Sequence, residues 1–178
     1  DGDYIVTTAW GERVITAQEL PAYEAFNTAV DAARSGNVHD AVTSYEAALA
    51  LKPDLFEGLI NLATLLTSRA ADDDVAVARK HLLAAINCAD HPTVKAAAYS
   101  NLAFLEQRVG GHDFGAAQVA EGIYLKALAS DPTFVDAMYN YGTLLEDQSR
   151  YDDATAQYRE VLNRKPDHST AQLNLANC

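Results

Sequence analysis

The sequence predicts an all-α protein, a right-handed solenoid of antiparallel helix pairs preceded by a short extended or hairpin arm. The triplet Asn-Leu-Ala occurs at 61–63, 101–103 and 174–176, and related triplets begin at Asn27 and Asn140. The five asparagines are 34, 40, 39 and 34 residues apart, a period typical of stacked helical repeats. Apolar residues recur at helical spacing through most of the chain, and prolines fall between the expected helices.

The first 20 residues predict a different structure. Residues 4–8 and 13–16 are rich in β-branched side chains and flank Trp10-Gly11-Glu12, which favours a turn. An isolated hairpin is only marginally stable in water, so we expect this arm of residues 1–20 to pack on the first helix. A disordered arm and a strand that docks in a groove are the alternatives.

From residue 22 onward the pattern predicts helix pairs and one final helix. The expected pairs are 22–35 with 38–51, 56–70 with 75–89, 94–109 with 116–130 and 134–150 with 151–164, and a last helix begins at Ser169. The repeat units are therefore 22–55, 56–95, 96–134, 135–168 and a partial unit 169–178, together spanning 22–178. Two units exceed 34 residues, and we assign the excess to turns over 69–75 and 109–115, which act as spacers or as a second contact surface.

Small and large residues alternate where the two helices of a pair must meet. In the fourth unit Gly142 meets Ala154, while Tyr158 fills the space beyond, an arrangement that fixes the crossing angle. With Val161 and Pro166, this spacing resembles the tetratricopeptide repeat family. The matching residues elsewhere are Ala29, Ala41, Tyr45, Ala48 and Pro53; Ala63, Ala78, Leu82, Ala85 and Pro92; and Ala103, Ala120, Tyr124, Ala127 and Pro132. The resemblance implies a concave groove, lined by the first helix of each pair, that binds proteins or peptides.

The recurring asparagines are the strongest candidates for ligand contact. Each stands two residues before the small contact residue, about 200 degrees around the helix from the close contact. An asparagine amide can hydrogen-bond to a backbone C=O and a backbone N–H together. Neighbouring helices pack about 8–10 Å apart, so their asparagines would contact roughly every third residue of an extended peptide. The set resembles the asparagine ladder of the O-GlcNAc transferase repeat domain, which implies peptide-binding roles for Asn27, Asn61, Asn101, Asn140 and Asn174, with Asn177 one turn further on. The alternative is that these asparagines only bridge adjacent helices.

Side chains beside the ladder are expected to select the ligand. Phe26, Phe104 and Tyr139 are candidates for apolar pockets, or else core residues, and Arg108 is a candidate anchor for an acidic group. Family members that clamp a C-terminal carboxylate use lysine where this chain has Tyr23, Glu57, Ala97 and Asp136. Glu57 and Asp136 instead make the groove acidic, so we expect no binding to heat-shock chaperone tails.

Composition and charge exclude several classes of function. A net charge of -12 disfavours binding to nucleic acid and anionic lipid and favours a neutral or basic partner. No stretch approaches the roughly 20 apolar residues of a membrane span. The histidines are scattered, and Asp72-Asp73-Asp74 lacks the glycine of a calcium loop, so we expect no catalysis, no metal and no cofactor.

Two interpretations of function remain. The first is a non-catalytic module that binds an extended peptide through the asparagine ladder. The second is a structural or oligomerisation module with no peptide ligand, since the helix 169–178 has no partner helix. Either the natural protein continues past Cys178 or this end associates with another molecule. Cys88 and Cys178 form no metal spacing and no disulfide framework, which favours the reducing cytoplasm, although localisation stays open.

Overall fold

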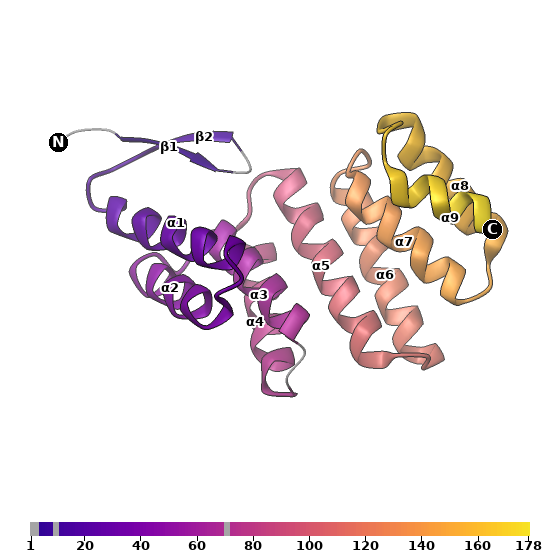
Figure 1. Ribbon diagram of the computed structural model, residues 1–178, viewed down its shortest axis with the longest axis horizontal. Coiled ribbons are helices and arrows are strands. Elements are labelled where there is room, and N and C mark those ends of the chain that lie inside the picture. The colour runs from indigo at the N-terminus through magenta and orange to yellow at the C-terminus, as the bar shows by residue number, and fades with distance from the viewer. Residues whose placement is uncertain (1–3, 9–10, 70–71) are drawn as a thin grey trace. The chain divides into compact units, whose positions relative to one another are not determined.

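A computed structural model describes residues 4–8, 11–69 and 72–178 (Figure 1). Over these residues the chain has two strands followed by nine helices, which confirms the all-α fold class with a short N-terminal arm. The chain divides into two compact units, residues 1–89 and 90–178. Each unit contains two antiparallel helix pairs, and the second unit ends with an additional helix.

The N-terminal arm is a β-hairpin. Strand β1 (Tyr4–Thr8) pairs with β2 (Gly11–Ile15) in antiparallel register, with Ile5 opposite Val14. The sequence predicted Gly11 and Glu12 in the turn, but both belong to β2, because pairing continues until Gly11 lies opposite Thr8. Trp10, the other residue of that predicted turn, lies outside the described residues.

The helices of the first unit are α1 (Leu20–Arg34), α2 (Val38–Leu51), α3 (Phe56–Arg69) and α4 (Asp72–Cys88). Helix α1 pairs with α2, α3 pairs with α4, and α2 packs on α3. The predicted small contact residues Ala29 and Ala41 are fully buried, as are Ala63 and Ala78. A methyl side chain at these positions allows the two helices of a pair to approach closely.

The second unit contains α5 (Pro92–Gly110), α6 (Phe114–Ser130), α7 (Val135–Asp147), α8 (Tyr151–Arg164) and α9 (Ser169–Asn177). Helix α5 pairs with α6, α7 pairs with α8, and α9 packs on α8. The fourth repeat has a close contact between its two helices. A β-carbon added to Gly142 would lie 2.7 Å from the buried ring of Tyr158, so only glycine fits there.

The extra length of the middle repeats lies mostly in helices, which corrects the predicted long turns. Helix α4 begins at Asp72, α5 continues through Gly110, and α6 begins at Phe114. These three helices have 17, 19 and 17 residues, against 14 in α2. Acidic residues are favourable in the first turn of a helix, and Asp113 caps α6 by accepting a 2.8 Å hydrogen bond from the Ala116 N–H. Both features start the second helix of a pair earlier than the apolar pattern suggests.

Candidate functional site

In the first unit, α1 and α3 border an open pocket of about 240 Å³. Ala33 of α1 and Tyr45 of α2 lie on one side of it, and the α3 side chains that line it are Asn61, Thr64, Leu65 and Ser68. The predicted ladder residue Asn61 is therefore at the edge of a surface depression. The other ladder residue of this unit, Asn27, is exposed on α1.

The pocket belongs to a longer stripe on α3. Glu57, Asn61 and Ser68 are separated by four and seven residues, so they share one helix face. At 1.5 Å per residue this stripe is about 17 Å long. At one end of the stripe, the charge of Glu57 helps to raise the pKa of Tyr23. At the other end, Ala33 lines the same pocket as Ser68. Helices α1 and α3 thus run in the same direction. We call the surface between them, from Glu57 to Ser68, the groove of the first unit, and the open pocket lies at its Ser68 end.

The N-terminal hairpin contacts the Glu57 end of this groove. The Arg13 guanidinium donates a 3.2 Å hydrogen bond from its NH1 group to Glu57 Oε1, and its central carbon lies 4.9 Å from the centre of the Phe56 ring. Ile15 is buried beside it in β2. The arm was expected to pack on the first helix; its Arg13 side chain bonds to Glu57 of α3, and its charge also acts on Tyr23 of α1. Glu57 was expected to be an open acidic groove residue, but Arg13 covers it and its side chain is only 2% exposed.

Tyr23 of α1 completes this cluster. Burial, and then the charge of Glu57, raise the pKa of the Tyr23 hydroxyl. That hydroxyl and Glu57 Oε2 are buried and have no hydrogen-bond partner among the described residues. We call Tyr23, Phe56 and Glu57 the arginine site, because Phe56 and Glu57 contact Arg13 and the charge of Arg13 acts on Tyr23.

In the second unit the ladder residues lie on α5, α7 and α9. Asn101 and Asn140 are half-buried, and the Asn140 Nδ2 group donates to Ser100 Oγ at 3.5 Å, the outer limit for a hydrogen bond. Asn174 is also half-buried and donates from Nδ2 to the Tyr158 hydroxyl at 3.2 Å. Asn177 is exposed near the end of α9.

Two of the ladder asparagines lie beside an equivalent tyrosine in different units. Asn61 and Tyr45 line the same pocket in the first unit, and Asn174 donates a hydrogen bond to the Tyr158 hydroxyl in the second. The tyrosine stands 16 residues before the asparagine in both cases. An amide has two N–H donors and a carbonyl acceptor, so one bond to tyrosine does not use up its capacity. Bridging of adjacent helices and contact with a ligand are therefore compatible roles for one asparagine.

The predicted aromatic and cationic contacts have different environments. Phe26 is 6% exposed and its ring centre lies 5.9 Å from that of Tyr45, so it is a core residue and offers almost no surface to a ligand. Phe104 is 39% exposed, and the Arg108 guanidinium lies 5.8 Å from its ring centre. Tyr139 is half-buried, and its ring centre lies 4.9 Å from the ring centre of His168. The pocket role predicted for Phe26 is thus corrected, whereas those of the other three stay predictions.

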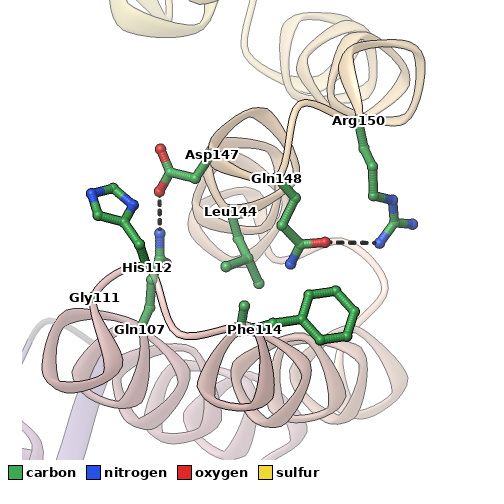
Figure 2. A pocket seen from close by; sticks show the side chains of 9 residues that line it. Gln107, Gly111, His112, Phe114, Leu144, Asp147, Gln148 and Arg150 are labelled. Atoms are coloured by element: carbon green, nitrogen blue, oxygen red, sulfur yellow. Dashed lines mark hydrogen bonds between the residues drawn. The ribbon is translucent and has the colours of Figure 1, made fainter.

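A second pocket, of about 260 Å³, lies where the α5–α6 turn meets the end of α7 (Figure 2). It is lined by Gln107, Gly111, His112, Phe114, Ala117, Leu144, Asp147, Gln148 and Arg150. The Gln107 side chain of α5 donates a 2.9 Å hydrogen bond to Asp147 of α7 and so links these two helices. The sequence singled out residues 109–115 as a possible contact surface, but it gave no signal for the side chains that α7 contributes.

Arg150, which lines that pocket, is already paired. Arg150 contacts Glu121 at 2.9 Å and Asp153 at 2.8 Å, and these carboxylates raise the pKa of its guanidinium. Glu121 also accepts a 2.7 Å hydrogen bond from Tyr141, whose pKa is raised to about 12, first by burial and then by that carboxylate. An anionic ligand would therefore compete with two carboxylates for Arg150.

Over the described residues, no cluster of three or more histidine, cysteine, aspartate or glutamate side chains has the arrangement of a metal site. Over the same residues, no helix is both long and apolar enough to cross a membrane.

Comparison with known families finds a likeness to tetratricopeptide repeats in the C-terminal part of the chain. Two models described as tetratricopeptide repeat match residues 123–156 and 142–178. A comparison with curated protein sequences finds no match.

Solved structures with a similar fold extend this likeness over most of the chain. A thermophilic tetratricopeptide repeat protein from Thermus thermophilus is 20% identical, with a TM-score of 0.73 over 88% of this chain and 80% of that one. The MamA protein is 19% identical, with a TM-score of 0.64 over 87% and 79%. YrrB, described as a tetratricopeptide repeat protein with an unusual peptide-binding site, is 15% identical, with a TM-score of 0.58 over 86% and 74%. These matches support a tetratricopeptide repeat domain.

Proposed function

We propose that this chain is a non-catalytic protein-interaction module that binds an extended peptide along the first helices of its repeats, with asparagine side chains contacting the peptide backbone. The observation that carries the proposal is the recurrent asparagine, which at Asn61 lines an open surface pocket. The bond of Asn174 to Tyr158 would hold its amide in one orientation while leaving polar capacity for a ligand. A fixed donor loses less entropy on binding than a mobile one.

The chemistry of the partner follows from the charge of the chain. A net charge of -12 repels polyanions and attracts neutral or basic segments. Backbone contacts alone select an extended conformation and little sequence, so neighbouring side chains such as Phe104, Arg108 and Tyr139 would supply the selectivity. The peptide-binding site named for YrrB makes peptides the first class of ligand to test.

The ladder can be tested by removing three amides that span both units. We expect the triple variant Asn61→Ala, Asn101→Ala and Asn140→Ala to bind many peptides more weakly, since each lost neutral hydrogen bond costs about 0.5–1.5 kcal/mol. A peptide array followed by calorimetry measures the change. Asn163→Ala is the matched control, because Asn163 is exposed on α8, a second helix of its pair. Equal affinity of the triple variant and the parent, with unchanged melting temperatures, would make these asparagines purely structural bridges.

A second candidate function is self-association through the last helix. Leu173 of α9 is 61% exposed, whereas Ala171 and Leu175 pack against the core of the second unit. Light scattering over a range of concentrations tests this directly. A stable dimer that Leu173→Asp dissociates would favour an assembly module, and a monomer that binds peptides would favour the peptide-binding function.

A further inference from the structure

Glu57 is a buried carboxylate in the groove of the first unit, and Arg13 of the N-terminal hairpin covers it. Its side chain is 2% exposed, while the Arg13 side chain that pairs with it remains 40% exposed. A buried carboxylate is costly to desolvate unless a cation and hydrogen bonds compensate it. The groove therefore contains a site that requires a cationic occupant.

Arg13 does not satisfy this site completely. It donates from its NH1 group to Glu57 Oε1, while Glu57 Oε2 and the Tyr23 hydroxyl are buried and have no partner among the described residues. A guanidinium has five N–H donors and often binds a carboxylate through two parallel hydrogen bonds. The arginine site thus has acceptor capacity beyond what the single bond from Arg13 uses.

The hairpin that brings Arg13 to this site has a largely exposed apolar face. An isolated two-stranded hairpin is marginally stable, and the Ile5 and Val14 side chains of this one are 69% and 67% exposed. Among the described residues, its attachment to the helices includes the Arg13 contacts and the buried Ile15. An ion pair with a partly exposed arginine contributes modestly to stability. A ligand that offers a better-placed guanidinium would therefore displace Arg13 at low cost.

We propose that the arginine site (Tyr23, Phe56 and Glu57) is a binding subsite for an arginine side chain of the partner peptide, and that Arg13 occupies it as an intramolecular competitor. This inference rests on the proposed peptide-binding function and names one side chain of its ligand. The hairpin then limits access to the groove, because the ligand's arginine and Arg13 cannot bind Glu57 together.

The spacing of the groove sets the position of this arginine in the ligand. The pocket bordered by Asn61 and Leu65 is centred about seven residues beyond Glu57 on α3, a distance of about 11 Å at 1.5 Å per residue. An extended peptide covers that distance in about three residues. The ligand is expected to have arginine, two residues of any kind, and then a small or apolar side chain.

Arginine fits this site better than lysine does. The Phe56 ring lies where a planar guanidinium can stack, and the two Glu57 oxygens can accept parallel bonds from it. A lysine ammonium has the same charge but lacks the planar fork. Citrulline has almost the same shape as arginine without the charge, so it separates charge from shape.

The test uses the full chain and the blocked tetrapeptide acetyl-Arg-Gly-Gly-Leu-amide, with versions that replace arginine by lysine or citrulline. Binding is measured by NMR titration at millimolar peptide. We expect the Arg13→Ala protein to bind the arginine peptide about two- to sixfold more tightly than the parent, with shifts at the Phe56 and Glu57 amides. Arg34→Ala, which removes an exposed arginine of α1, should bind as the parent does. Glu57→Gln should abolish the preference for arginine over citrulline.

The outcomes separate this inference from the proposed function. If Arg13→Ala and the parent bind the arginine peptide equally, or if citrulline binds as well as arginine, the arginine subsite is refuted. Peptide binding that still depends on the ladder asparagines would in that case leave the proposed function standing. If Arg13→Ala melts at a much lower temperature, Arg13→Gln replaces it, because glutamine keeps a donor near Glu57. Absence of binding by either variant also refutes the subsite.

Discussion

The close contact between Gly142 and Tyr158 gives a sharp test of how the fourth repeat packs. Adding a methyl group by Gly142→Ala would place the new carbon 2.7 Å from Cε1, 3.0 Å from Cδ1 and 3.2 Å from Cζ of the Tyr158 ring. The ring cannot easily move away. It is fully buried, and its hydroxyl donates a 2.7 Å hydrogen bond to Glu146 and accepts one of 3.2 Å from Asn174.

Two opposing effects set the magnitude. Alanine is favoured over glycine inside a helix by about 0.8–1.0 kcal/mol. Overpacking a rigid core contact costs about 1–3 kcal/mol. At this distance the cost of overpacking should exceed the gain in helix preference, so we expect Gly142→Ala to destabilise the second unit by about 1 kcal/mol.

Gly122 provides a matched control in the same unit. It lies inside α6, and a β-carbon added there would meet no other atom within 4 Å. Gly122→Ala should therefore gain the full helix preference, and the two variants should differ by about 2 kcal/mol, or roughly 10 °C in melting temperature. Differential scanning calorimetry measures both. If Gly142→Ala is as stable as Gly122→Ala, the ring of Tyr158 does not constrain this helix contact, and the small-against-large rule fails for this repeat.

Three further results are expected. Hydrogen bonds from the Thr16 backbone and from Lys52 lower the pKa of Glu19 to about 2. The stabilising effect of the Glu19 carboxylate is therefore complete above pH 4.5 and is lost as the pH falls toward 2. The stability of Glu19→Gln, followed by urea unfolding, should depend less on pH over that range, and a pH profile identical to that of the parent would contradict this. Ala154→Leu should cost about 1–3 kcal/mol, because Ala154 is fully buried at a helix contact, and an unchanged melting temperature would count against that contact. Cys178 is exposed and Cys88 is half-buried, so a thiol reagent should label Cys178 quickly and Cys88 slowly. Equal labelling rates would indicate that the end of α4 around Cys88 is accessible to solvent.

Features that depend on local sequence could be predicted well. The bounds of α2 and α8 agree with the periodicity, and the asparagine side chain of Asn37 caps α2 by accepting from the Asp40 N–H. The small residues at helix contacts were also predictable, because one repeated pattern specifies them. The starts of α4 and α6 were predicted too late, since polar residues in a first helical turn resemble a loop when only the apolar periodicity is considered.

Features that depend on distant residues could not be predicted in the same way. Arg13 and Glu57 are 44 residues apart, and no local pattern pairs one with the other. The charge at Glu57 was noted in the sequence, but its burial was not, because the hairpin that covers it lies outside the repeat pattern. Phe26 had the spacing of both a groove residue and a core residue, and only its packing on Tyr45 distinguishes the two.

The contact between the hairpin and α3 also has a consequence for synthesis of the chain. The ribosome makes Arg13 and Ile15 well before it makes Phe56 and Glu57, and the delay at about 5–20 residues per second is roughly 2–9 seconds. During that interval the hairpin lacks the helix on which it docks, and two strands alone are marginally stable. The arm that comes first in the sequence is therefore expected to be among the last parts of its unit to acquire a fixed structure.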